Sequence, residues 1–195
     1  MTSSKKEKST FQKWSGYLLN AALILVILTF FIPSWRMAFQ SWYQGLTLSE
    51  VSFENTIQQE ISDQDATWEL FDLDGNMFNF AEFKGRPIVI NFWATWCSYC
   101  RVELAELKEL KSQVNTEVVF IAITEETPQM IENSGLDKDY SFLYTTQNFP
   151  SFAQVSAYPT LLVIDSEMNI IHRQEGAGAI NTEKNISFLN DLLLK

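Results

Sequence analysis

Two cysteines stand where an apolar strand pattern changes to a helical one, and this junction constrains the fold more than any other part of the chain. Residues 88–93 (Ile-Val-Ile-Asn-Phe-Trp) are apolar nearly throughout, as in a strand that is covered on both faces of a sheet. From Leu104 onward, apolar residues recur every three or four positions, which predicts a helix. Cys97 and Cys100 therefore lie between a buried strand and the first turn of a helix.

The rest of the compact part alternates strand and helix patterns. Apolar runs predict strands at 68–73, 77–80, 87–93, 118–123, 161–164 and 170–173, and helical spacing predicts helices after Cys97, at 128–133 and at 181–194. An Asp-Gly pair at 74–75 separates the first two runs, which is a hairpin signal. This order predicts an α/β fold with a mixed central sheet flanked by helices and preceded by a β-hairpin.

A segment of 22 residues without a charge, 14–35, separates Lys13 from Arg36. As a helix it would be about 33 Å long, which matches the hydrocarbon core of a bilayer. Four lysines precede it, so the positive-inside rule predicts a cytoplasmic N-terminus. A buried core helix and a cleaved signal peptide are the alternatives, but the apolar run is longer than a usual signal-peptide core. We expect an uncleaved single transmembrane helix.

These patterns divide the chain into four parts. We expect a cytoplasmic N-terminus (1–13), a transmembrane signal anchor (14–35), a stalk or linker (36–66) and a compact domain (67–195). The polar linker could also be a solvated loop packed loosely on the domain. The net charge is +4 up to Arg36 and −14 beyond it, which disfavours nucleic acid as a partner.

Metal chemistry is disfavoured because the 195 residues include only two cysteines and one histidine, His172. A structural zinc site would need carboxylates to complete it, which is uncommon. We interpret His172 as an ordinary strand residue, and we expect no metal and no cofactor other than a redox-active disulfide between Cys97 and Cys100.

The start of a helix favours an anion, because its N–H groups are unpaired and the helix dipole is positive there. This environment stabilises a Cys97 thiolate, which attacks disulfides whereas a thiol does not. Cys97 is therefore the predicted nucleophile, and Cys100, one turn deeper, would resolve the mixed disulfide. Half of a zinc site and an inert buried pair are the alternatives.

Two signatures resemble the membrane-anchored bacterial thioredoxin-like proteins of the TlpA, ResA and CcmG type. The first comprises 72–75, 83–87 and 90–103, and the second is Tyr158-Pro159-Thr160 before a strand. The resemblance covers about residues 67–195 and implies a thioredoxin fold and thiol–disulfide exchange with exported proteins. It also implies that Pro159 is cis and that the loop Tyr158-Pro159-Thr160 binds the substrate, with the Tyr158 backbone pairing with the incoming peptide.

The sequence departs from this pattern around the cysteines. Ser98-Tyr99 replaces a dipeptide that often ends in proline, and this dipeptide is a main determinant of thiolate stability. Asn91 occupies the position of a buried aspartate in thioredoxin, so the proton acceptor for Cys100 is unassigned. Glu103 is a hypothesis for that role, and an exposed helix carboxylate is the alternative. Trp96 would pack beside the cysteines, as would Trp93, for which a structural role is expected.

The resemblance implies a membrane-tethered thiol–disulfide oxidoreductase in the bacterial inner membrane, with its catalytic domain in the periplasm. We expect it to act as a reductant of exported cysteine-containing proteins, for example in cytochrome c maturation. A disulfide oxidase or isomerase is the alternative, and a thiol peroxidase or a non-catalytic binding module is more remote. The sequence has one expected membrane span and no second cysteine pair that could pass electrons to Cys97 and Cys100. We therefore expect a membrane electron donor or acceptor as a partner.

Overall fold

The computed structural model describes residues 10–31, 33–54, 57–138 and 140–194. These residues form two compact units, divided between Tyr43 and Gln44. The first unit holds α1 (Thr10–Phe31) and most of α2 (Pro33–Gly45). Among the described residues, no helix is long and apolar enough to cross a membrane, so the predicted span over 14–35 is not confirmed. Residue 32, which belongs to that span, lies outside the described residues.

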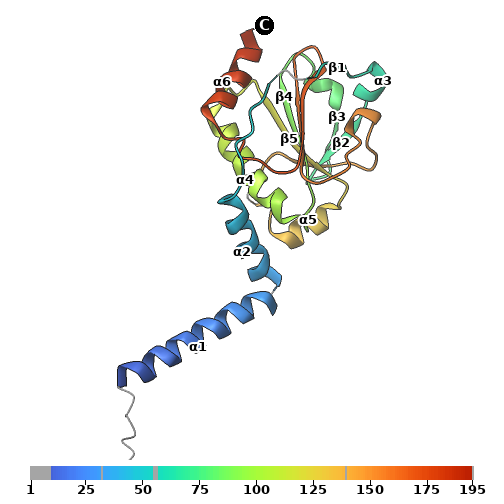
Figure 1. The fold of residues 1–195 in the computed structure, drawn as a ribbon. Coiled ribbons are helices and arrows are strands. Elements are labelled where there is room, and N and C mark those ends of the chain that lie inside the picture. The colour runs from blue at the N-terminus through green and yellow to red at the C-terminus, as the bar shows by residue number, and fades with distance from the viewer. Residues whose placement is uncertain (1–9, 32, 55–56, 139, 195) are drawn as a thin grey trace, which may run out of the picture. The chain divides into compact units, whose positions relative to one another are not determined.

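The second unit is built on one mixed sheet in the order β1-β8-β7-β4-β5-β6-β2-β3 (Figure 1). Its central strand β4 is parallel to β5 and antiparallel to β7, and β5 is parallel to β6. At one edge, β2 and β3 pair antiparallel on either side of Gly75, which has a positive φ of 85° that glycine adopts without strain. The strands are β1 (Gln59–Glu60), β2 (Glu69–Asp72), β3 (Met77–Asn79), β4 (Ile88–Phe92), β5 (Val119–Thr124), β6 (Leu143–Thr145), β7 (Thr160–Ile164) and β8 (Asn169–Glu175).

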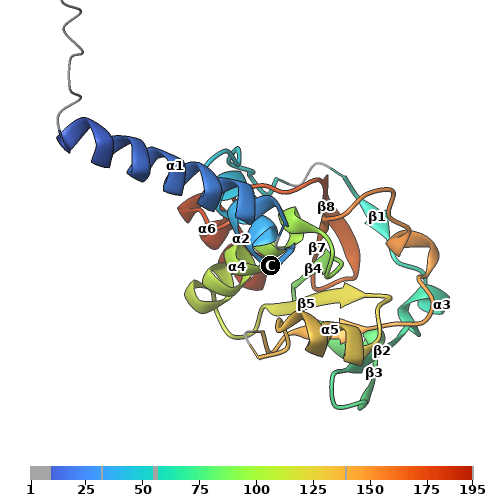
Figure 2. The same ribbon diagram turned by 90° about the horizontal axis from the view of Figure 1, so that it is seen from below.

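Helices cover both faces of this sheet, which confirms the predicted α/β class. The helices are α3 (Asp63–Ala66), α4 (Ser98–Gln113), α5 (Pro128–Ser134) and α6 (Glu183–Asp191), with short 3₁₀ turns η1 (Phe80–Phe83), η2 (Ser151–Ala153) and η3 (Leu192–Leu194). Figure 2 shows α4 and α6 on one side of the strands and α3 on the other. The predicted last helix, 181–194, is thus a shorter α-helix followed by a 3₁₀ turn.

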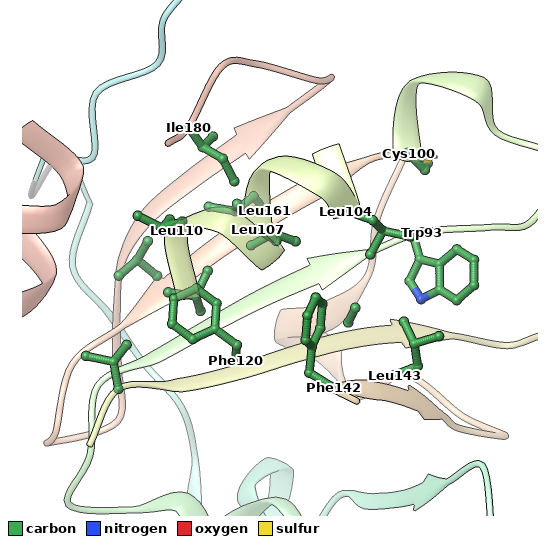
Figure 3. Close-up of a cluster of buried hydrophobic side chains, with 14 of the residues drawn as sticks. Trp93, Cys100, Leu104, Leu107, Leu110, Phe120, Phe142, Leu143, Leu161 and Ile180 are labelled. Carbon is green, nitrogen blue, oxygen red and sulfur yellow. The ribbon is translucent and has the colours of Figure 1, made fainter. Parts of the chain in front are cut away.

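Two apolar clusters fill the space between the sheet and these covers. Because side chains alternate along a strand, Val89 of β4 faces one cluster while Ile88 and Ile90 face the other. The first cluster includes the leucines of α4 at 104, 107 and 110, which pack toward sheet side chains such as Phe120 and Leu161 (Figure 3). β4 is buried along its whole length, as its apolar run predicts.

The compact unit begins earlier than the predicted residue 67. Phe53 is only 1% exposed, and its N–H donates to the buried side chain of Asn185 at 2.7 Å. Nearby, the N–H of Val51 donates to the carbonyl of Ala179 at 3.1 Å. The described residues of 44–66, a stretch that was expected to be a stalk or linker, are therefore part of the compact unit. A few buried apolar side chains and the amide of Asn185 hold them there.

Candidate active site

The junction between β4 and α4 carries the two cysteines, as the sequence pattern predicts. Cys97 is the N-cap of α4, and its sulfur accepts a hydrogen bond from the N–H of Cys100 at 3.1 Å. The two form a disulfide. Cys97 is 7% exposed whereas Cys100 is fully buried, so an incoming sulfur can reach only Cys97. Figure 3 shows Cys100 at the start of the helix, above the leucines of α4.

A proline loop lies beside this junction. The Tyr158–Pro159 peptide bond is cis, as the resemblance implies. Thr160 follows it, begins β7 and pairs with Phe92 at the end of β4. Because Phe92 immediately precedes the segment that leads to Cys97, this register brings the proline loop to the same end of the sheet as the disulfide.

Exposed aromatic rings surround the disulfide. Trp96 is 68% exposed, and its ring meets that of Tyr158 edge-on at a centroid distance of 5.9 Å. Tyr99, within the cysteine dipeptide, is 47% exposed. Trp93, by contrast, is fully buried in the same apolar cluster as both cysteines, which agrees with its expected structural role. The outer rings are therefore available to a partner, whereas the inner one supports the fold.

Glu103 is fully buried, so the alternative of an exposed helix carboxylate is wrong. It lies three residues after Cys100 on α4, which places both on one face of the helix. One of its oxygens accepts from the Nδ2 of Asn91, and the other accepts from the N–H of Gly178 at 3.3 Å. Burial raises the pKa of Glu103 to about 7, although these two hydrogen bonds oppose the rise.

Asn91 can serve both protonation states of this carboxyl group. Its Oδ1 is buried, and no described residue pairs with it. Turning the side-chain amide of Asn91 by 180° would replace its donor with this acceptor, which a protonated Glu103 can bind through its O–H. Asn91 can therefore form a hydrogen bond with Glu103 in both protonation states of the carboxyl group.

Glu126 is a feature of the site that the sequence analysis missed. Its carboxylate accepts hydrogen bonds from the N–H of Thr95 at 2.6 Å and from its hydroxyl at 2.8 Å. Burial, together with the charges of Glu125 and Glu126, raises the pKa of Tyr158. Both glutamates also line a cavity of about 270 Å³. The available signal was their position directly after a buried parallel strand, where α/β proteins commonly place functional groups.

The remaining ionisable groups were compared with the patterns of a metal centre and of a core histidine. Among the described residues, no group of three or more His, Cys, Asp or Glu side chains is arranged to hold a metal ion. His172 lies buried on β8, where its ring packs against Phe53 at a centroid distance of 5.4 Å. Burial lowers the pKa of His172, as in a core histidine.

Comparisons with known proteins agree with this geometry. A family model described as Redoxin matches residues 58–187. Thiol-disulfide oxidoreductase ResA of Bacillus cereus (strain ATCC 10987 / NRS 248) is 27% identical over 137 residues, which cover 68% of this chain and 79% of the relative. Thioredoxin-like protein YneN of Bacillus subtilis (strain 168) is 23% identical over 131 residues, covering 64% of this chain and 77% of the relative.

A solved structure shows the same fold. It is that of a secreted Mycobacterium tuberculosis disulfide oxidoreductase homologous to E. coli DsbE. The TM-score is 0.53 at 17% sequence identity, and the match covers 68% of this chain and 98% of that one. The chain belongs to the Redoxin family, as a thioredoxin-like protein of the TlpA, ResA and CcmG type.

Proposed function

We propose that this protein, a thiol–disulfide oxidoreductase of the ResA and DsbE type, reduces disulfides in exported proteins. One observation carries the proposal: the Cys97–Cys100 disulfide at the start of α4 lies at the same end of the sheet as the cis-Pro159 loop. This arrangement gives one reachable sulfur, one shielded sulfur and a neighbouring backbone for a substrate peptide.

The reaction is a pair of sulfur exchanges. The reduced enzyme's Cys97 thiolate attacks a client disulfide, forming a bond to one client sulfur while the client S–S bond breaks. The released client thiolate takes up a proton. Cys100 then loses its proton and attacks Cys97, which breaks the mixed disulfide and releases the second client sulfur as a thiol. The client gains two electrons and two protons, and the enzyme is left with its Cys97–Cys100 disulfide.

We assign the proton of Cys100 to Glu103. Cys100 and Glu103 share a face of α4, and both are fully buried, so water is not at hand as an acceptor. A carboxyl group with a pKa of about 7 can take a proton and release it again at neutral pH. Asn91 would then be a positioning residue that holds Glu103 in both states.

Clients would dock over the exposed rings and the proline loop. Trp96 and Tyr99 flank the disulfide, and Trp96 rests on Tyr158. In this proposal the Tyr158 backbone pairs with an extended client segment, and Pro159 and Thr160 shape the same loop. Aromatic surfaces of this kind accept varied side chains, which suits a site that must meet cysteines in different proteins.

Electrostatics supports the direction of electron flow. The carboxylate of Glu126 is bonded to Thr95, two residues before Cys97. Glu103 follows Cys100 by three residues on α4. Negative charge disfavours a Cys97 thiolate and so favours the disulfide form. A dithiol that converts readily into its disulfide is a reductant.

We also propose that residues 14–35 hold the protein in the bacterial inner membrane, with the domain in the periplasm. The support is the uncharged stretch of 22 residues and the lysines that precede it. A membrane protein would then supply electrons to the Cys97–Cys100 disulfide. The net charge of −14 beyond Arg36 favours partners with basic surfaces, and apocytochrome c is one candidate client.

The experiment compares two cysteine variants of the full chain. Cys97→Ser should abolish reduction of a model protein disulfide, whereas Cys100→Ser should trap a mixed disulfide between Cys97 and a client. Full reductase activity in Cys97→Ser would show that the nucleophile is wrongly assigned. Ser112→Ala, a change far along the exposed side of α4, is the control and should behave as the unmodified protein.

A further inference from the structure

We propose that Gln44 is a positioning residue for the redox pair and that it favours the Cys97 thiolate by holding Ser98. This inference rests on the proposed function, since it concerns how the same cysteines are tuned. Gln44 lies at the end of α2, in the segment that the sequence analysis assigns to the linker, and it is the first residue of the compact unit.

The contact falls inside the cysteine dipeptide. The Nε2 of Gln44 donates a hydrogen bond to the hydroxyl oxygen of Ser98 at 3.2 Å, and the pair is partly buried. The next residue, Gly45, lies so that an added Cβ would be 3.7 Å from Cγ1 of Val102. Because Ser98 and Val102 are four residues apart, they share one face of α4. The chain therefore passes along the first turn of the helix that begins at Cys97.

Gln44 is held there by the segment that follows it, residues 44–53, which we call the strap. The carbonyl of Ser49 accepts from the N–H of Ala179 at 2.9 Å, and the N–H of Val51 donates back to Ala179. The buried side chain of Asn185 donates to the carbonyl of Val51 at 2.7 Å. These backbone anchors lie only a few residues beyond Gln44, so the strap limits where its amide can move.

The strap also reaches the buried carboxyl group. Gly178, which precedes Ala179, donates its N–H to Glu103. A Cβ on Gly178 would lie 2.3 Å from Cγ2 of Val51, so only glycine permits this close approach. The strap thus contacts the redox machinery at two places, at the cysteine dipeptide through Gln44 and at the loop that holds Glu103 through Val51.

The direction of the effect follows from the polarity of the amide. Ser98 is the first residue of α4 and directly follows Cys97, whose sulfur becomes a thiolate. An N–H pointing at this turn places the positive end of a dipole near Cys97, which adds to the field of the helix N-terminus. Replacing the amide with a carboxylate removes the donor and adds a negative charge, whereas replacing it with an apolar chain of equal length only removes the donor.

The test titrates Cys97 by its rate of alkylation as a function of pH. The full chain in detergent carries Cys100→Ser, so that one thiol reports. Gln44→Met should raise the midpoint because the thiolate loses about threefold in its equilibrium with the thiol, a size expected for one lost hydrogen bond. Gln44→Glu should raise the midpoint further. Ser52→Ala, on the strap and with its hydroxyl bonded to the exposed Glu54, is the matched control and should leave the midpoint unchanged.

Two results would overturn the inference. A midpoint that is the same in Gln44→Met and Gln44→Glu as in the control shows that Gln44 does not act on Cys97. Equal shifts in all three variants show that any disturbance of the strap has the same effect. Failure of the proposed function is recognised separately, because the chain with both cysteines would then not exchange with glutathione. If Gln44→Glu does not fold, the alkylation midpoint of Gln44→Met is compared with that of Ser52→Ala, and equal midpoints overturn the inference.

Discussion

Glu103 should cost the protein stability at neutral and alkaline pH, and Glu103→Gln should recover it. The carboxyl group is fully buried, and burial raises its pKa to about 7 from its ordinary value of 4.5. A group whose pKa is higher in the folded state binds protons more tightly there. The contribution of Glu103 to the free energy of unfolding is therefore most favourable below pH 4.5. This contribution is lost as the pH rises from 4.5 to about 7.

The size of the effect follows from the shift. With a pKa of about 7 when folded against 4.5 when unfolded, the lost stability approaches about 3 kcal/mol above pH 7. Glutamine cannot ionise, so its free energy of unfolding lacks this dependence. Its amide can still accept from Gly178, and Asn91 can turn its unpaired Oδ1 to meet the new N–H donor. Glu103→Gln should thus be more stable at pH 8 and nearly unchanged at pH 4.

The assay is urea unfolding of the oxidised full chain in detergent, followed by circular dichroism, at pH 4, 6 and 8. The difference in unfolding free energy between Glu103→Gln and the unmodified protein should grow with pH by roughly 1.4 kcal/mol per unit between pH 4.5 and 7. Glu109→Gln, on the same helix but exposed, is the control. A difference that is flat with pH, or a variant that is less stable at pH 8, would refute the burial argument.

Two further changes test the packing and the docking surface. Gly178→Ala should destabilise the domain by about 1–3 kcal/mol in the same unfolding assay, because the new methyl group would overlap Val51; Gly16→Ala, with open space around it, should not. Trp96→Ala should change the stability by less than about 0.5 kcal/mol, since the side chain is mostly exposed, yet slow the reduction of protein disulfides more than that of glutathione disulfide. Equal slowing with both substrates would contradict a docking role.

The sequence predicted those parts of the fold in which local pattern and tertiary environment agree. β4 is an apolar run that is buried on both faces, and α4 begins at the residue after Cys97, where the periodicity changes. The cis bond at Pro159 followed from a motif whose meaning comes from a resemblance. No single-residue preference would have shown it, because most prolines are trans.

The sequence pattern did not predict the parts of the structure that polar contacts hold in place. The buried amide of Asn185 fixes the strap from a position more than 130 residues away in the sequence, which no local pattern shows. β6 is only three residues long, too short to show a period. Glu103 looked like one of several glutamates on a helix, and only the packing of α4 against β4 and the loop at Gly178 shows that it is buried.

The reduction potential of the Cys97–Cys100 pair determines whether this protein donates electrons or a disulfide to its clients. The full chain would be equilibrated in graded glutathione buffers, and its thiols trapped by alkylation. We expect reversible exchange with a strongly reducing potential, near that of thioredoxin at about −270 mV. A value near that of DsbA, about −120 mV, would contradict the reductant assignment and make the pair a disulfide donor. A disulfide that does not equilibrate at all would contradict the assignment of the redox site itself.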